Sequence, residues 1–323
     1  MGEIGSVAVL GIDSERIKIG VGGASLENLK PKEAGEKAIQ EALINIGQQE
    51  RTPQLVYITT TPGQEEEILA GIEEIIGSEV PVIGGSAGDE TLKGRWSNIV
   101  NNEIHSNGIA LSVIVSDLKM GYGHDFGYLK GTHRGVVTKA KERTLYEIDN
   151  KPAAEVYNQW TNNQFDEELK EGGMILGKAT FFPLGKILTE QKKEEKEYFP
   201  THPGLINLPE KSITMFTNIE AEDEVVLLEG NWEWLINRVQ RMSQQILISA
   251  DIPKREGTFA FFTFCTGNLL GIPESERNKI AVLLKEEIGE IPYIGGFTLG
   301  EQIYFSGIGN RHANLVSSLA IFK

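Results

Sequence analysis

Two short segments combine glycines with acidic side chains, the residue types that can hold a small zwitterion. One reads GGSAGDE over residues 84–90, and the other reads GGFTLGE over residues 295–301. Exposed backbone N–H groups beside glycines can bind a carboxylate, and Asp89, Glu90 or Glu301 can accept an ammonium group. Glycines and acids are also common in turns for structural reasons alone. The candidate ligand-binding residues are Gly84, Gly85, Ser86, Asp89, Glu90, Cys265, Gly295, Gly296, Phe297 and Glu301.

A serine nucleophile is the first alternative to simple binding. Ser86 lies in the pattern G-x-S-x-G, which in α/β-hydrolases presents a nucleophilic serine between a strand and a long helix. Residues 89–96 read DETLKGRW and show no sustained helical face, and Phe297 replaces the serine in the second segment. A tight turn whose glycines adopt positive φ explains the pattern better, and catalysis by Ser86 remains the alternative.

Cys265 is the single cysteine and ends the apolar run TFAFFTFC at residues 258–265. No histidine is close in sequence, and the helix expected from about Glu274 begins too far away to stabilise a thiolate. We interpret Cys265 as a small buried residue that can line a pocket, because ligands bind where the strands of an α/β sheet end. A nucleophilic thiol is the alternative.

The sequence indicates neither a metal site nor a nucleotide cofactor. The five histidines show no H-E-x-x-H or H-x-H spacing, and one cysteine makes neither a disulfide nor a zinc site by itself. Residues 172–179, GGMILGKA, approach the phosphate-binding pattern G-x-x-x-x-G-K-[ST], but Ala179 lacks the hydroxyl that would hold Mg²⁺. We expect no metal and no cofactor.

An internal repeat must position the two glycine segments. Residues 79–90 (EVPVIGGSAGDE) and 290–301 (EIPYIGGFTLGE) align without a gap and share six identities. Hydrophobic spacing predicts the same elements around each copy: strand, helix, strand, helix, glycine segment and closing strand. They are expected at 17–21, 34–46, 54–61, 65–76 and 109–115 in the first half, and at 225–228, 232–246, 258–265, 280–288 and 315–322 in the second.

The predicted fold class is therefore α/β, with two related β-α-β-α-β-β repeats that form layered mixed sheets. Residues 117–223 differ, because short strands with many glycines and prolines predict an irregular, β-rich middle segment. We expect a first domain over residues 1–140 and a second over 141–323, the second including a less regular insert at 160–223. If the halves pack about a pseudo-two-fold axis, the segments 84–90 and 295–301 either face each other or line equivalent crevices.

Composition limits the classes of partner. The chain has 323 residues, 31 basic and 46 acidic side chains, and a net charge of −15. Such a charge repels a phosphate backbone, so we expect no nucleic-acid partner. No stretch approaches the roughly 18 apolar residues that a spanning helix needs, and the first residues lack the pattern of a signal peptide. We expect no membrane insertion and a cytoplasmic location.

The order of these motifs resembles the FIST family, small-ligand sensory domains of prokaryotic signalling proteins that are built from an N-terminal and a C-terminal half. Three positions depart from the family pattern: Asn268 stands where arginine is frequent, Asp89 where glutamate is, and Leu299 where an aromatic residue is. The resemblance implies that the chain senses small molecules, for which amino acids are the usual suggestion. It rests on residues 81–89 (PVIGGSAGD), 146–157 (YEIDNKPAAEVY), 264–268 (FCTGN), 296–301 (GFTLGE) and Asn314.

The function that we expect is a non-catalytic sensor that binds a small metabolite, such as an amino acid, beside the repeated segments. Nothing in the chain looks like a kinase, a cyclase or a coiled coil, so the sensor would report to a separate output protein or act as a homodimer. The alternatives are a small-molecule hydrolase or transferase that uses Ser86 or Cys265, and a scaffold without a ligand.

Overall fold

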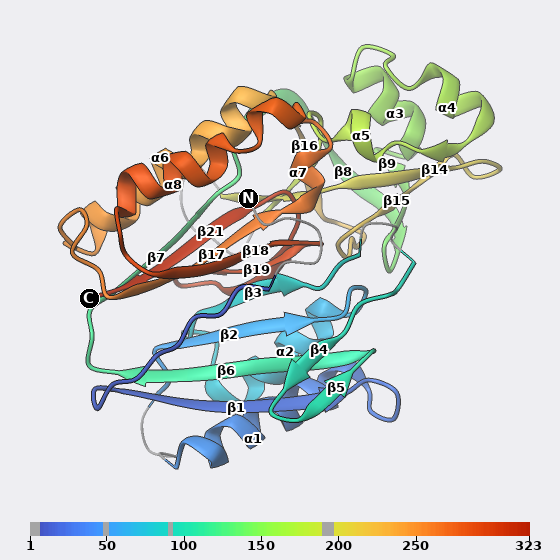
Figure 1. Cartoon of the computed structure of the whole chain (residues 1–323). Coiled ribbons are helices and arrows are strands. Elements are labelled where there is room, and N and C mark those ends of the chain that lie inside the picture. The colour runs from blue at the N-terminus through green and yellow to red at the C-terminus, as the bar shows by residue number, and fades with distance from the viewer. Residues whose placement is uncertain (1–6, 48–51, 90–92, 189–196) are drawn as a thin grey trace.

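Two mixed β-sheets pack face to face at the centre of the protein, and a pair of helices covers the outer face of each (Figure 1). The structure is a computed structural model that describes residues 7–47, 52–89, 93–188 and 197–323. The layer between the sheets is apolar and contains, among others, Ile83 and Leu55 from the first sheet and Phe261 and Phe322 from the second. Hydrophobic burial between the sheets therefore holds the two halves together.

The first sheet contains the strands predicted for the first half and two strands from the end of the chain. Helices α1 (Pro31–Ile46) and α2 (Glu65–Ile76) cover its outer face. Only β2 and β3 are parallel neighbours, because the crossover through α2 returns the chain in the same direction. The strand order is β1 (Ile17–Ser25), β6 (Gly108–Ser116), β2 (Leu55–Thr60), β3 (Val82–Ser86), β19 (Glu301–Phe305) and β20 (Gly309–Ala313).

The second sheet repeats this arrangement. Helices α6 (Trp232–Ser249) and α8 (Lys279–Ile288) cover it. Its strand order is β18 (Tyr293–Thr298), β17 (Phe259–Cys265), β21 (Ser317–Phe322) and β7 (Met120–Asp125). This order matches β3-β2-β6-β1 in the first sheet, with one parallel and two antiparallel pairings in corresponding places. The predicted fold class and repeat are confirmed.

One strand of the second repeat is not where the sequence predicted it. Residues 225–228 do form a strand, β16 (Glu224–Glu229), but it lies in a third sheet. The first strand of the repeat is instead β7, which is separated from α6 by the whole middle segment. β7 was not recognised in the sequence because it contains glycines. A Cβ on Gly121 or Gly123 would come within 2.8 Å of Ile246 in α6. Close helix packing demands small residues there, so the strand lacks an apolar pattern.

The middle segment is β-rich, as predicted, and its described residues form a nine-stranded antiparallel sheet. Helices α3 (Ala153–Trp160), α4 (Asp166–Glu171) and α5 (Leu176–Ala179) lie at one end of it (Figure 1). The strands, in chain order, are β8 (Leu129–Lys141), β9 (Thr144–Ile148), β10 (Lys151–Pro152), β11 (Gly173–Met174), β12 (Leu184–Ile187), β13 (Tyr198–Thr201), β14 (Pro203–Asn207), β15 (Ser212–Met215) and β16. Register shifts occur between β14 and β15, between β16 and β8, and between β8 and β9. The domain boundary predicted near residue 140 stays a prediction.

The glycine pairs lie inside strands and not in the tight turns that we predicted. Gly84 and Gly85 belong to β3, and Gly295 and Gly296 belong to β18. Of the four, only Gly84 has a positive φ, +148°, and a Cβ there would come within 1.8 Å of the Ile58 carbonyl oxygen. The first pair is thus required mainly by the close approach of neighbouring chain segments.

Smaller elements complete the repeats. The hairpin of β4 (Asn98–Val100) and β5 (Glu103–His105) precedes β6, and α7 (Thr266–Leu269) with a 3-10 turn (Glu274–Glu276) follows β17. Among the described residues, no helix has the length and apolar character needed to cross a membrane.

Candidate functional site

The end of β3 is hydrogen-bonded to the residues that directly follow β18, the equivalent strand of the repeat. The Ser86 N–H donates to the carbonyl of Gly300, and the Leu299 N–H donates to the carbonyl of Ser86, both at 2.9 Å. The chain then continues into β19, which pairs antiparallel with β3 through Glu301 and Gln302. The two segments that the repeat singled out therefore meet, and they form one wall of a cavity.

The cavity has a volume of about 340 Å³, within the usual range for small-molecule sites. It lies where the carboxyl ends of β2, β3, β17 and β18 approach the middle sheet. Its apolar lining includes Pro62, Trp96, Leu176, Phe216, Leu270 and Leu299. Its polar lining includes Glu65, Asp89, Arg143, His202, Cys265 and Asn314. Mostly apolar walls with a few polar groups are typical of sites that orient a small ligand.

Glu65 is the most deeply buried acid of the cavity, at 1 % exposure in the first turn of α2. Its Oε1 accepts the Ser86 hydroxyl at 2.6 Å, and its Oε2 accepts Arg143 Nη2 at 2.6 Å and the Gly63 N–H at 2.8 Å. Burial opposes ionisation, but His312, Arg143 and these hydrogen bonds outweigh it and lower the pKa of Glu65 to about 2. Glu65 is therefore an anion held in the cavity wall.

Arg143 reaches the cavity from the turn between β8 and β9. Its Nη2 contacts Glu66 at 2.8 Å as well as Glu65, and its Nε donates to Asn218 Oδ1 at 3.4 Å. Burial acts against the charged form, but the two carboxylates raise the pKa of Arg143 above its ordinary value. Among the described residues none accepts a hydrogen bond from Nη1, so this group can bind an anionic ligand.

His202 and Asn314 are fixed to each other on another wall. Asn314 Oδ1 accepts the backbone N–H of His202 at 3.0 Å, which leaves the amide Nδ2 to offer a ligand. Burial lowers the pKa of His202 to about 4, so its ring is neutral at pH 7. Its Nε2 lies 3.0 Å from the Leu176 carbonyl, which can only accept. Nε2 therefore carries the proton, and Nδ1 is the acceptor.

Cys265 lines the cavity, and Glu301 lies directly behind it, in contact with the thiol. Burial, followed by the charge of Glu301, raises the pKa of the Cys265 thiol well above its ordinary value. Burial raises the pKa of Glu301 to about 8, although Thr298 Oγ1 at 2.6 Å and the Val316 N–H at 3.1 Å both donate to its carboxylate. A protonated thiol is a poor nucleophile, so this arrangement does not activate Cys265.

Asn268, which stands where the FIST family often has arginine, contacts an arginine from another element. Arg238 of α6 is fully buried, and its Nη2 donates to Asn268 Oδ1 at 2.6 Å. Its Nη1 donates to the carbonyls of Phe126 and Leu315, both at 2.6 Å. Leu315 has φ +59°, an uncommon conformation for a residue other than glycine. The buried guanidinium thus holds the turn that carries Asn314.

The ten predicted site residues fall into four groups. Asp89 and Cys265 line the cavity, although the Asp89 carboxylate already accepts the backbone N–H groups of Lys93 and Arg95. Ser86 and Glu301 lie directly behind the lining, and Glu90 lies outside the described residues. The remaining five, which are not among the lining residues, are Gly84, Gly85, Gly295, Gly296 and Phe297.

Several lining residues were missed by the sequence analysis. Glu65 is the first residue of the predicted helix 65–76, where negative charge is generally favourable, so nothing in the sequence singled it out as a site residue. Arg143 and His202 lie in the middle segment, for which no site was predicted, and tertiary packing alone brings them to the cavity. Asn314 was noted as part of the FIST resemblance, and it does line the cavity.

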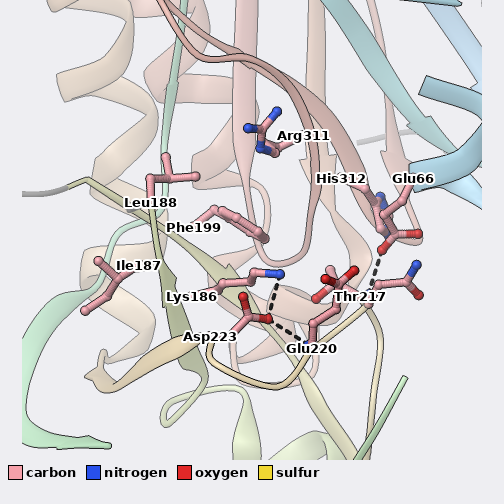
Figure 2. A pocket seen from close by; sticks show the side chains of 11 residues that line it. Glu66, Lys186, Ile187, Leu188, Phe199, Thr217, Glu220, Asp223, Arg311 and His312 are labelled. Atoms are coloured by element: carbon pink, nitrogen blue, oxygen red, sulfur yellow. Dashed lines mark hydrogen bonds and ion pairs between the residues drawn. The ribbon is translucent and has the colours of Figure 1, made fainter. Parts of the chain in front are cut away.

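A second cavity, of about 290 Å³, is lined by Glu66, the residue that follows Glu65 in α2, and by Lys186, Asp223 and His312 among others (Figure 2). Its charged side chains are largely engaged with each other. Lys186 lies 2.7 Å from Asp223, and Glu66 accepts the Asn218 N–H at 2.7 Å. The first cavity, which offers Arg143 Nη1 and Asn314 Nδ2 within apolar walls, is therefore the candidate functional site.

Two family models match consecutive parts of the chain. The FIST N domain matches residues 1–151, and the FIST C domain matches residues 153–304. The chain belongs to the FIST family. FIST domains are associated with sensory signal transduction and with the binding of small ligands. The candidate cavity is lined by residues from both matched regions, with Glu65 and Arg143 from the first and His202 and Cys265 from the second.

A similarity to a curated protein covers part of the chain. The uncharacterized protein MJ1623 of Methanocaldococcus jannaschii is 27 % identical over 186 residues, which are 55 % of this chain and 33 % of that protein. The matched region therefore spans about a third of the length of this relative.

Proposed function

We propose that the chain is a non-catalytic sensory module that binds an amino acid with an apolar side chain in the cavity between its two FIST halves. The observation that carries the proposal is Nη1 of Arg143, which has no acceptor among the described residues and belongs to a fixed cation at the wall of a mostly apolar cavity. A guanidinium already held by two carboxylates on one side is pre-organised to bind a ligand carboxylate on the other.

The remaining groups of the cavity suit the rest of such a ligand. Among the described lining residues, Glu65 and Asp89 are two acids and Arg143 is one cation, so the cavity favours a ligand that carries an ammonium group besides its carboxylate. His202 Nδ1 is a neutral acceptor for an N–H donor. Trp96, Phe216 and the lining leucines would pack against an aliphatic or aromatic side chain.

A binding role is supported over catalysis by the state of both candidate nucleophiles. The Ser86 hydroxyl donates to the carboxylate of Glu65, and Cys265 is a buried thiol with a raised pKa. Among the described residues, no neutral histidine that could act as a base is hydrogen-bonded to Ser86 or Cys265. Signal output would then depend on a separate protein that recognises the ligand-bound form.

The test is a thermal-shift panel of the twenty amino acids, followed by calorimetric titration of each one that stabilises the protein. A ligand at 100 times its Kd raises the free energy of unfolding by about 2.7 kcal/mol. Arg143→Lys keeps a cation beside Glu65 but removes the second donor, so we expect an affinity loss of about tenfold or more. Arg134→Lys, at an exposed position of β8, is the matched control and should bind as the wild type does.

Two outcomes would contradict the proposal. If none of the twenty amino acids stabilises the protein, the ligand is not an amino acid. Equal affinities for the wild type and Arg143→Lys would remove the assigned carboxylate contact, even if some amino acid binds.

A further inference from the structure

The edge of β18 is open at the place where the corresponding edge of β3 is covered. In the first sheet β3 lies between β2 and β19, whereas β18 ends the second sheet and, among the described strands, pairs only with β17. The four-stranded cores of the two sheets are otherwise equivalent. The comparison within one chain therefore identifies a strand as the kind of element that fits the free edge of β18.

Gly296 supports the same conclusion. Its φ is not in the left-handed region, and a Cβ built on it would meet no described atom within 4 Å. Its counterpart Gly85 is required, because a Cβ there would come within 2.3 Å of Thr298. A glycine inside a strand weakens the strand, and it often marks a place where another backbone approaches closely. Nothing described in this chain makes that approach to Gly296.

We propose that β18 pairs antiparallel with β18 of a second copy of this chain across a two-fold axis, so that two four-stranded sheets become one continuous sheet. The ten residues 291–300 (IPYIGGFTLG) carry no charge, although the whole chain has a net charge of −15. Two copies repel each other over most of their surface, but not along this strand. A long uncharged edge without protecting lysines is suited to pairing with another strand.

Backbone geometry defines the register of this pairing. The Ala260 N–H donates to the Pro292 carbonyl at 2.9 Å, so the peptide groups of residues 292, 294, 296 and 298 point toward β17. Those of Tyr293, Gly295 and Phe297 point to the free edge, because successive residues alternate. Antiparallel pairing joins outward-pointing residues to one another. The symmetric register that uses all three residues is centred on Gly295, which then faces Gly295 of the second copy.

This register brings exposed aromatic side chains together. Tyr293 faces Phe297 of the second copy, and each of these side chains is 38 % exposed in the single chain. Aromatic cross-strand pairs stabilise antiparallel sheets. Ile294 faces Gly296 of the second copy, which leaves room for the isoleucine side chain. An isologous contact of this kind closes on itself and produces a dimer.

The test is sedimentation velocity of the full chain over a range of concentrations. We expect a dimer of twice 35.6 kDa that dissociates on dilution. Tyr293→Lys and Phe297→Glu each place a charge opposite an aromatic ring and should weaken the dimer at least tenfold. The double variant places Lys opposite Glu on the other copy and should regain much of the loss, because only this register joins positions 293 and 297. Ile104→Glu, at an exposed apolar position of β5, should leave the mass unchanged.

Hydrogen exchange gives a second measurement that does not depend on any variant. The Gly295 and Phe297 amides should exchange slowly in the dimer and rapidly after dilution. A chain that stays at 35.6 kDa at the highest concentration reached overturns the proposal. The proposal is also overturned if both single variants fold, as judged by circular dichroism, and still dimerise as the wild type does. It is overturned as well if the double variant dimerises no more tightly than either single variant.

Discussion

Ser86 donates its hydroxyl hydrogen to Oε1 of Glu65 over 2.6 Å, and both side chains are buried. The serine of a hydrolase elbow needs a base that can take its proton, but Glu65 has a pKa of about 2 because His312, Arg143 and hydrogen bonds outweigh its burial. This carboxylate is too weak a base for that task at neutral pH. The hydrogen bond instead joins the end of β3 to the start of α2 and helps to form the cavity wall.

Replacement of Ser86 by alanine should therefore reduce stability without removing an activity. The variant loses a hydrogen bond to a buried charged group, which costs about 1–3 kcal/mol of the free energy of unfolding. Urea denaturation of Ser86→Ala, with the exposed Ser78→Ala as control, measures this cost. The native protein should also remain unlabelled by a fluorophosphonate. A covalent adduct on Ser86 would contradict the structural role.

Glu65 should make the protein sensitive to acid. Its pKa is lowered from 4.5 to about 2 in the folded state, so its contribution to stability is present above pH 4.5 and is lost as the pH falls toward 2. A shift of this size corresponds to roughly 3 kcal/mol. We expect Glu65→Gln to be less stable than the wild type at pH 7, with the difference shrinking below pH 4.5. Glu67→Gln, exposed on the same helix turn, should show no such trend.

Glu301 should produce the opposite dependence in a different pH window. Burial raises its pKa from 4.5 to about 8 in the folded state, against the hydrogen bonds from Thr298 and Val316. The stability that the protonated form retains below pH 4.5 is lost as the pH rises through 8. Between pH 4.5 and 8, the free energy of unfolding of Glu301→Gln should therefore rise relative to that of the wild type by roughly 3–5 kcal/mol.

Denaturant titrations of the Glu301→Gln variant at several pH values test this expectation. Glu290→Gln, at an exposed position before β18, is the matched control and should track the wild type. A constant difference between Glu301→Gln and the wild type from pH 4.5 to 8 would mean that Glu301 is ionised throughout this range.

The two repeated glycines should respond differently to alanine. Gly85→Ala places a methyl group 2.3 Å from Thr298, so overpacking should cost about 1–3 kcal/mol. Gly296→Ala places it in space that no described residue fills, and alanine should stabilise the strand by about 0.5–1 kcal/mol. The free energy of unfolding, measured for both variants at low protein concentration, tests the contrast. A large loss for Gly296→Ala would reveal a neighbour within this chain.

Periodicity and repetition were sufficient to predict most of the two halves. The apolar spacing in residues 65–76 and 280–288 predicted helices that the structure places as α2 and α8, and the shared pattern around Gly84 and Gly295 predicted equivalent strands. These elements are predictable because one face of each is buried against a sheet, and burial leaves a period in the sequence. The repeat was compatible with two segments that meet and with two segments that line separate, equivalent crevices, and the structure shows that they meet.

The first strand of the second repeat was not predictable in the same way. β7 owes its glycines to the close packing of α6, and 106 residues separate its end, Asp125, from the start of that helix at Trp232. Local patterns carry no information about which of two candidate strands a distant helix will cover. The apolar strand β16 was therefore predicted to be the first strand of the second repeat, although it belongs to the third sheet.

The sequence by itself determined the repeat and most of the helices and strands of its two copies, because each of these depends on local spacing or on the likeness of two segments. The tertiary structure alone decided the chemistry of the cavity. Glu65, Arg143 and His202 come from three distant parts of the chain, and only packing of the middle sheet against both halves brings their charges and hydrogen-bonding groups together. Long-range contact, not local propensity, selects the residues that can touch a ligand.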